Sequence, residues 1–316
     1  MTIGICARNS ENIVLDAINS VIQQDFDHRL MEIVFVDDGS EDNTLQIVKA
    51  AFSEIDVPAI IFHDGWRGIG KARNTIVQNA NGEYIIWLDS DEVLEKDFVR
   101  RQINLMELNP KAAIATARMK FPYEQNQVLT LEHIPYIVEN RFRDWKDPSK
   151  LPGTGGTTYR LKAIKEAGGF DENLQGSCED IDAAYRMTQA GWLIIRGNSF
   201  FEESHEGLST FGALWKRSLK RGETSRRVYN KNTVFFSVYR MNPLASFVAG
   251  VRYGIIGYLL TKKKVSFLLP FFYAFKSTAW FLGFTRSRSQ KSQVVQKSNR
   301  LLDKGLKKLV YGPKLY

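Results

Sequence analysis

Three pairs of acidic residues stand where a chain can present carboxylates to a ligand. The pairs are Asp37 with Asp38, Asp89 with Asp91, and Glu179 with Asp180. Carboxylates can share a divalent cation, accept hydrogen bonds from a sugar hydroxyl, or remove a proton from a nucleophile. The residue types therefore predict a site for a hydroxyl-bearing or phosphate-bearing ligand, provided that the fold brings the pairs together.

Asp89 and Asp91 follow the apolar run Ile85–Leu88, which has the length of a buried strand. Ligands of open α/β sheets bind at the carboxyl ends of strands, so these two side chains could share a cation that also holds a substrate's phosphates. Alternatively, Asp89 and Ser90 only cap the next helix. Glu92 is expected to have that capping role in either case.

Asp37 and Asp38 follow a second apolar run, Met31 to Val36, in the same way. Either carboxylate could accept hydrogen bonds from a nucleobase or a ribose. The alternative is an ordinary turn, because Asp and Gly are common in turns of any function.

Glu179 and Asp180 lie in the first turn of the helix predicted at residues 181–190. Acidic residues there are favoured by the helix dipole alone. They can also face a cleft and act as a general base if the proton lies within hydrogen-bond reach.

Strands alternate with helices in the first 110 residues, which predicts right-handed crossovers and a parallel sheet. Residues 123–150 lack periodicity and are expected to be an irregular, pocket-shaping loop. The predicted strands are 3–7, 31–36, 59–62, 83–88 and 112–120, and the predicted helices are 13–22, 45–52, 72–80 and 97–108.

The stretch Gly65–Lys71 nearly matches a phosphate-binding P-loop, but Ala72 stands where that motif places Ser or Thr to hold magnesium. An ATPase is therefore disfavoured. The glycines are expected to let the backbone approach a ligand, with Arg73 placed to meet negative charge.

Charge divides the chain into two unlike parts. Residues 1–204 carry 21 Lys and Arg against 32 Asp and Glu, whereas residues 205–316 carry 22 against 3. The basic part could meet nucleic acid, anionic lipid or substrate phosphates.

With only Cys6 and Cys178, no disulfide framework is predicted. The first strand begins directly after Met1, without a leader sequence, so we expect a cytoplasmic catalytic part.

Several motifs in a fixed order resemble those of glycosyltransferase family 2, enzymes of the GT-A fold. The resemblance covers residues 1 to about 205. The matching segments are Val36–Thr44, Gly70–Asn74, Asn81–Tyr84, Leu88–Asp91, and Gly168–Glu172 with Glu179 and Asp180. It implies an α/β fold with a Rossmann-like, mostly parallel sheet flanked by helices.

The resemblance also implies an inverting transfer of a sugar from a UDP-, GDP- or dTDP-linked donor, with Mg²⁺ or Mn²⁺ as cofactor. By this mapping Asp37 and Asp38 contact base and ribose, Asp89 and Asp91 contact ribose and metal, and Asp180 deprotonates the acceptor, with Glu179 beside it. His205 completes the metal site or is a surface histidine. The further expected donor contacts are Ala7, Arg8, Arg73, Gly155 and Gly156.

Residues 205–240 are expected to form a basic lid in which Arg217 and Arg221 neutralise the diphosphate. The family's processive polysaccharide synthases carry a Gln-x-x-Arg-Trp signature near here, which this chain lacks. That difference favours transfer of a single sugar.

Two apolar stretches, Leu244–Leu260 and Val265–Phe284, follow, but each contains a cation and the first is short for a membrane span. A spanning hairpin would also place the lysines of residues 262–264 opposite the cytoplasm. We therefore predict helices lying in the cytosolic interface of an anionic membrane, serving a lipid-linked or polysaccharide acceptor. The alternative is that they only pack on the catalytic domain.

These inferences give a catalytic domain at 1–204, with a nucleotide half to about 110 and an acceptor half from 111. A lid at 205–240 and a membrane-associated helical appendage at 241–316 follow. The rival function is a non-catalytic nucleotide- or glycan-binding module. No nucleic-acid partner is expected, because apolar blocks separate the basic clusters and suit lipid better.

Overall fold

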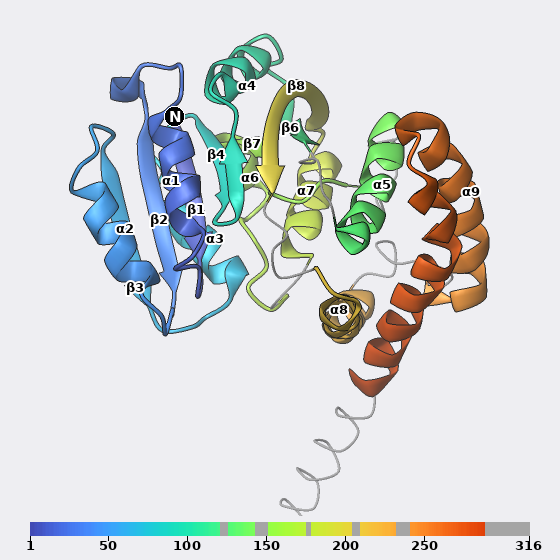
Figure 1. Cartoon of the computed structure of the whole chain (residues 1–316). Helices are drawn as coiled ribbons and strands as arrows, with labels where there is room; N and C mark the ends of the chain where they lie inside the picture. The colour runs from blue at the N-terminus through green and yellow to red at the C-terminus, as the bar shows by residue number, and fades with distance from the viewer. Residues whose placement is uncertain (121–125, 143–150, 175–177, 204–208, 232–240, 288–316) are drawn as a thin grey trace, which may run out of the picture.

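A computed structural model describes residues 1–120, 126–142, 151–174, 178–203, 209–231 and 241–287. Within these ranges one mixed sheet of eight strands, in the order β3-β2-β1-β4-β7-β6-β8-β5, is flanked by helices. A group of helices stands beside it (Figure 1). This mixed α/β architecture confirms the predicted fold class.

Four parallel strands form the first half of the sheet. They and their crossover helices are β1 (Thr2–Ala7), α1 (Val14–Ile22), β2 (Glu32–Asp38), α2 (Thr44–Phe52), β3 (Ala59–Asp64), α3 (Ile69–Asn79) and β4 (Tyr84–Asp89). The central strand β1 is buried throughout, as expected for apolar strands covered on both faces. Its neighbours β2 and β4 both end on aspartates, so Asp37 and Asp89 reach the same edge, two strands apart.

The second half of the sheet is mixed. Its elements are β5 (Glu92–Leu94), α4 (Phe98–Glu107), β6 (Ala112–Lys120), β7 (Thr157–Arg160), α6 (Leu161–Glu166), α7 (Glu179–Gln189) and β8 (Leu193–Glu203). Strand β7 runs antiparallel between β4 and β6. Strand β5 pairs antiparallel with β8, so the chain turns back after Asp89 and does not enter a helix there.

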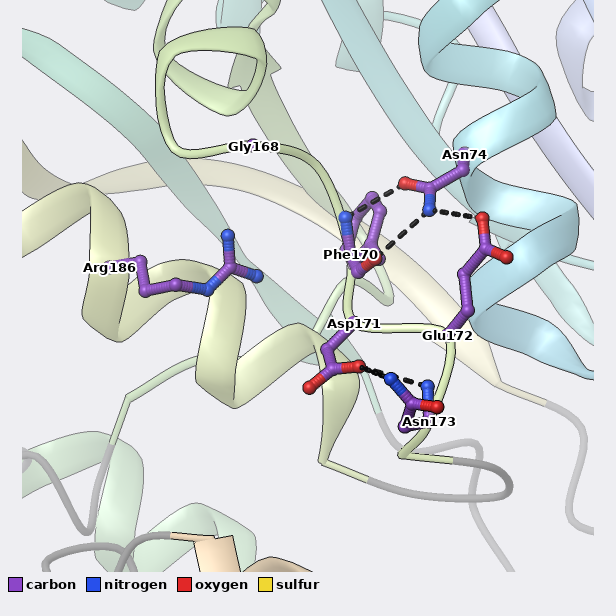
Figure 2. A pocket seen from close by; sticks show the side chains of 7 residues that line it. All are labelled: Asn74, Gly168, Phe170, Asp171, Glu172, Asn173 and Arg186. Atoms are coloured by element: carbon purple, nitrogen blue, oxygen red, sulfur yellow. Dashed lines mark hydrogen bonds between the residues drawn. The ribbon is translucent and has the colours of Figure 1, made fainter.

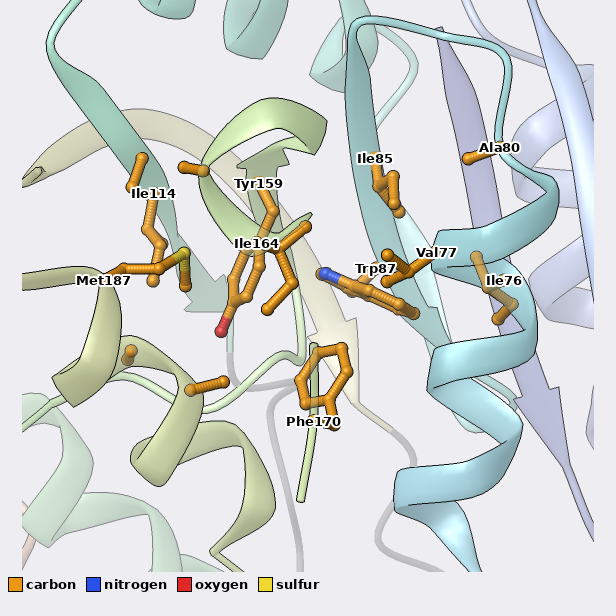
Figure 3. Packing of buried hydrophobic residues seen from close by; sticks show 14 of the residues in the cluster. Ile76, Val77, Ala80, Ile85, Trp87, Ile114, Tyr159, Ile164, Phe170 and Met187 are labelled. Carbon is orange, nitrogen blue, oxygen red and sulfur yellow. The ribbon is translucent and has the colours of Figure 1, made fainter. Parts of the chain in front are cut away.

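Aromatic rings fill the core between α3, α7 and the sheet (Figure 3). The rings of Trp87 and Phe170 meet edge to face at 5.4 Å between centroids, and those of Trp87 and Tyr159 at 6.0 Å. This packing joins the acidic edge of β4 to the segment before α7, so it fixes the acidic pairs relative to each other.

The predicted irregular loop at 123–150 is wrong for its central part, because residues Gln127–Phe142 form helix α5. The sequence concealed this helix because its apolar residues are not confined to one face and Pro135 lies inside it. Its buried residues join a separate apolar cluster that includes Leu131, Ile134, Leu269 and Phe272.

Besides a short 3-10 helix, His28–Leu30, the remaining described helices are α8 (Phe211–Lys231), α9 (Pro243–Thr261) and a final helix, Lys264–Ser287, whose first turn, Lys264–Leu268, is 3-10. Glycines let α9 pack closely on the final helix: a Cβ on Gly250 would lie 2.5 Å from the Pro270 Cα. By length and composition, α9 and the final helix are each apolar enough to cross a membrane.

Candidate active site

Arg73 joins two of the acidic pairs. It lies on α3 and is 6% exposed. One guanidinium nitrogen, Nη1, forms an ion pair with Glu179 of α7, and Nη2 lies 3.5 Å from Asp89 Oδ1 at the end of β4. The ring of Phe170 supports the guanidinium from 5.8 Å. One buried cation therefore holds the end of β4 and the start of α7 in a fixed relation.

Glu179 is almost fully buried, and its Oε2 has no hydrogen-bond partner among the described residues. Burial and the charge of Asp180 raise the pKa of Glu179 to about 7, against the opposing charge of Arg73. Glu179 can therefore gain or lose a proton near neutral pH. Its neighbour Asp180, unlike the buried Glu179, is partly exposed.

A glycine turn lies against both Asp180 and Asp89. A Cβ on Gly153 would lie 2.9 Å from Asp180 Oδ2, and one on Gly155 would lie 3.5 Å from Asp89 Oδ2. Gly156 has φ +59°, in the left-handed region that favours glycine. This turn, residues 153–156, thus lies between Asp180, the expected base, and the end of β4.

Glu92 does not cap a helix, which corrects the expectation from the sequence. It begins β5, is 2% exposed, and its Oε2 accepts hydrogen bonds from the backbone N–H groups of Asp89 and Gly156, each at 3.1 Å. Burial, and then the charge of Asp89, raise its pKa well above the ordinary value. Glu92 therefore ties the Asp89 turn to the glycine turn.

The two aspartates that end β2 have different environments. Asp37 is fully buried; its Oδ2 lies 2.8 Å from His63 Nδ1, and its Oδ1 accepts from the Ser40 N–H at 3.1 Å. Strand register explains the histidine contact, because Asp37 and His63 are direct neighbours on β2 and β3. Ala7 neighbours Asp37 on the other side, on β1.

Asp38 binds the backbone of the glycine-rich stretch that resembles a P-loop. Its carboxylate accepts hydrogen bonds from the N–H groups of Arg67 at 2.8 Å and Gly68 at 3.0 Å. Those amides are thus occupied by a protein carboxylate, and Gly68 adopts φ +93° where α3 begins. The stretch has a local structural role that the sequence did not indicate.

Arg8 lies with its guanidinium over the ring of Trp66, 5.3 Å from the ring centroid. The Trp66 side chain is 56% exposed, so it offers an aromatic surface beside the ends of β1 and β2. Such a surface could stack on a nucleobase.

The turn that precedes α7 is clamped from two helices (Figure 2). Asn74 of α3 accepts from the Phe170 N–H at 2.8 Å and donates to the Phe170 carbonyl at 2.9 Å. Arg186 of α7 donates to the carbonyls of Ala167 and Gly169. A shallow pocket borders this turn, but the clamp mainly fixes Phe170 beneath Arg73.

The remaining predicted residues lie elsewhere. His205 falls outside the described residues. Arg217 and Arg221 lie exposed on α8, which stands between the sheet domain and the helical group (Figure 1). The Arg221 guanidinium lies over the Trp280 ring at 5.4 Å, so it contacts the final helix.

Asp89 and Asp91 suit a hard divalent cation, because both offer oxygen donors and the Asp89 side chain is 42% exposed. Among the described residues, no three His, Cys, Asp or Glu side chains converge on one point. The protein would therefore supply one or two carboxylates, which is the pattern of magnesium sites completed by water and substrate phosphates.

The sequence did not indicate the roles of three residues in the site: His63, Glu92 and Asn74. The register of β2 with β3 could have indicated His63, since it lies beside Asp37 once the two strands are paired. Asn74 belongs to the matching segment Gly70–Asn74, but no sequence signal indicates its bond to Phe170, 96 residues away, or the bond of Glu92 to Gly156, 64 residues away.

The sequence matches the family model "Glycosyl transferase family 2" over residues 2–167. The poly(ribitol-phosphate) β-N-acetylglucosaminyltransferase TarS of Staphylococcus aureus is 35% identical over 29% of this chain and 16% of its own length. The poly-β-1,6-N-acetyl-D-glucosamine synthase of Staphylococcus epidermidis is 23% identical over 76% of this chain and 57% of its own. The chain thus spans less than two thirds of these relatives.

Solved structures share the fold. The mannosyltransferase PcManGT of Pyrobaculum calidifontis, in complex with GDP-Man and Mn²⁺, superposes with a TM-score of 0.67 at 16% identity, over 92% of this chain and 87% of that one. S. aureus TarS gives 0.52 at 17% identity, over 89% and 54%. With the family model matching more than half of the chain, the chain belongs to glycosyltransferase family 2 and has the GT-A fold.

Proposed function

We propose that this chain transfers one sugar from a nucleotide-diphosphate sugar to an acceptor hydroxyl, with inversion and with Asp180 as general base. The observation that carries the proposal is the arrangement around Arg73 and the glycine turn. Asp180 lies against Gly153 and Asp89 lies near Gly155. Arg73 connects the end of β4 to the start of α7 by contacting Asp89 and Glu179. A binding module needs no base, so this arrangement favours an enzyme.

Each group then has a distinct task. Asp37, held by His63 and Ser40, accepts hydrogen bonds from the nucleotide, and the exposed Trp66 ring, in contact with Arg8, stacks on the base. Asp180 removes the proton from the acceptor hydroxyl as the new bond forms, while the nucleotide diphosphate leaves with the bonding electron pair. Because Arg73 contacts both Asp89 and Glu179, it holds Asp180, the neighbour of Glu179, in a fixed position relative to Asp89.

Asp89 and Asp91 would hold Mg²⁺ or Mn²⁺, with His205 as a further candidate ligand. When bound, the cation neutralises charge on the leaving diphosphate. The Mn²⁺ in the PcManGT complex supports this assignment by fold analogy. Calorimetry with UDP, GDP and dTDP, each with and without Mn²⁺, tests it. We expect Mn²⁺ to tighten binding of the preferred nucleotide, and Asp91→Asn to remove that gain while metal-free affinity stays unchanged.

The general-base assignment is tested with Asp180→Asn. Both S. aureus TarS and the S. epidermidis synthase are named for N-acetylglucosamine, so UDP-N-acetylglucosamine is the first donor to try. We expect transfer to fall about 10²- to 10⁴-fold with nucleotide affinity unchanged. A variant that transferred sugar at the wild-type rate would refute Asp180 as base, whereas lost nucleotide affinity would indicate a folding defect.

We also propose that α9 and the final helix attach the protein to the cytosolic face of an anionic membrane, where a lipid-linked or polysaccharide acceptor is met. Large apolar side chains remain exposed along both helices, and Arg252, Lys262 and Lys264 are exposed among them. The exposed apolar residues are Leu244, Val248, Val251, Ile255, Leu259, Leu260, Phe267, Leu268, Phe271, Phe281 and Leu282. Such a surface suits an acyl boundary rimmed by anionic headgroups.

Vesicle flotation tests the attachment. The wild type should float with vesicles of phosphatidylglycerol and phosphatidylcholine, and less with phosphatidylcholine alone, because the cations contribute. The Val248→Glu/Ile255→Glu variant should stay in the soluble fraction. Leu108→Glu, at an 81% exposed leucine of the catalytic domain, is the matched control and should float like the wild type. Equal flotation of all three proteins would refute the assigned surface.

A further inference from the structure

Helix α8 crosses the final helix at two glycines. A side chain at Gly222 would collide with the Trp280 carbonyl, and one at Gly283 would collide with the Leu219 carbonyl, so the two backbones are in direct contact. Trp280 Nε1 also donates to Ser225 Oγ at 3.0 Å. The side chains beside this crossing are therefore held at fixed positions.

Three cations gather at the crossing. Arg217 and Arg221 are one turn apart on α8, and Lys276 lies one turn before Trp280 on the final helix. The Arg221 guanidinium lies over the Trp280 ring at 5.4 Å. Burial lowers the pKa of Lys276, Glu132 opposes that effect, and the charges of Arg221 and Arg217 lower it further.

The cluster carries more positive than negative charge. Lys276 Nζ donates to both carboxylate oxygens of Glu132 on α5 at 2.5 Å, so this amine is neutralised. Within the described part of the chain, no carboxylate lies within ion-pair distance of Arg217 or Arg221, and both side chains are exposed. Two guanidinium groups on successive turns are suited to bidentate contacts with phosphate oxygens.

Helix α8, which carries Arg217 and Arg221, stands between the sheet domain and the helical group (Figure 1). Burial raises the pKa of Tyr136 on α5, the charges of Arg221 and Arg217 lower it, and those of Glu132 and Glu203 raise it. Glu203 ends β8 directly opposite Glu92, which contacts the Asp89 turn. Phe271 and Phe281 lie on the same helix as Lys276 and are exposed at 66% and 43%.

We propose that Arg217 and Arg221, beside the Lys276–Glu132 ion pair, form the binding site for the phosphate or diphosphate of a lipid-linked acceptor, whose hydrocarbon chain lies along the exposed apolar face of the final helix. The inference rests on the proposed transferase function and names the class of its acceptor. It reassigns the two arginines from the donor diphosphate, where the sequence placed them, to the acceptor. Arg217 and Arg221 make the contacts, and Lys276 pairs with Glu132, so it leaves the charge of the two arginines uncompensated.

The test measures binding of farnesyl diphosphate to the full chain in phosphatidylcholine nanodiscs, without metal, by calorimetry. Arg217→Gln/Arg221→Gln changes only exposed side chains, and Lys216→Gln, an exposed lysine of the same helix, is the matched control. We expect the double variant to bind farnesyl diphosphate about 10- to 100-fold more weakly. Lys216→Gln should bind it like the wild type, and affinity for farnesol should not change.

Further ligands separate the possible sources of phosphate. Inorganic pyrophosphate should bind the wild type more weakly than farnesyl diphosphate, because it lacks the chain. Equal affinity for the two would overturn the lipid assignment. If the double variant loses UDP or GDP affinity by the same factor, the arginines bind the donor diphosphate and not the acceptor. If Lys216→Gln loses as much affinity for farnesyl diphosphate as the double variant does, the attraction is non-specific. If the wild type binds no nucleotide, the transferase proposal itself is wrong. If only the lipid assignment is wrong, the wild type still binds nucleotide.

Discussion

Replacing Arg73 with Gln should destabilise the protein in a manner that depends on pH. The substitution removes the buried cation that lies between Glu179 and Asp89. Loss of the Asp89 contact and of guanidinium packing on Phe170 should cost about 1–3 kcal/mol at any pH. The additional, pH-dependent cost comes from Glu179, which then lacks its opposite charge.

The sign follows from proton linkage. The pKa of Glu179 is about 7 in the folded protein, above its unfolded value of 4.5, so the folded state holds an extra proton between these values and stability falls as pH rises. In the wild type this fall ends near pH 7. Without Arg73 the folded pKa is higher still, so stability continues to fall by about 1.4 kcal/mol per pH unit. From about pH 7 to about pH 8.5 the variant should lose roughly 2 kcal/mol more than the wild type.

Urea unfolding of the full chain in a nonionic detergent, followed by tryptophan fluorescence, measures this difference. Arg73→Gln and the wild type are compared near pH 6 and near pH 8.5. The control is Arg73→Gln/Glu179→Gln, which removes the titrating carboxyl and should show no extra loss at high pH. If Arg73→Gln destabilised the protein equally at both pH values, Arg73 would not act through the charge of Glu179.

Three further outcomes are expected. His63→Ala should weaken nucleotide binding by about 1–2 kcal/mol in calorimetry, because Asp37 loses a hydrogen bond that orients it; unchanged affinity would place Asp37 outside the nucleotide site. Gly156→Val should reduce transfer more than nucleotide affinity, since its side chain would collide with Phe201 and displace the turn beside Asp89; wild-type kinetics would contradict this. Gly250→Leu should lower the urea midpoint while Gly212→Leu, in open space, should not, because only Gly250 abuts a neighbouring backbone; equal midpoints would rule out the close crossing.

The order of strands and helices in the first half was determined by the sequence. Apolar runs of strand length, three of the four ending on Asp, alternate with helical periodicity, and local pattern is enough to define such units. The same reasoning correctly placed Glu179 and Asp180 in the first turn of a helix. It failed at Gln127–Phe142, because helix α5 is buried on several sides by α9 and the final helix and so lacks a one-sided apolar pattern.

Only the tertiary structure decided how the acidic pairs relate to one another. Arg73 and Glu179 are 106 residues apart, and no local spacing indicates that they form an ion pair. Glu92 could have capped a helix, but the turn into β5 buries it. Because a buried carboxylate requires hydrogen-bond donors, it accepts from the amides of Asp89 and Gly156. Residue types thus determined which chemistry is available, whereas strand order and burial determined which groups share one site.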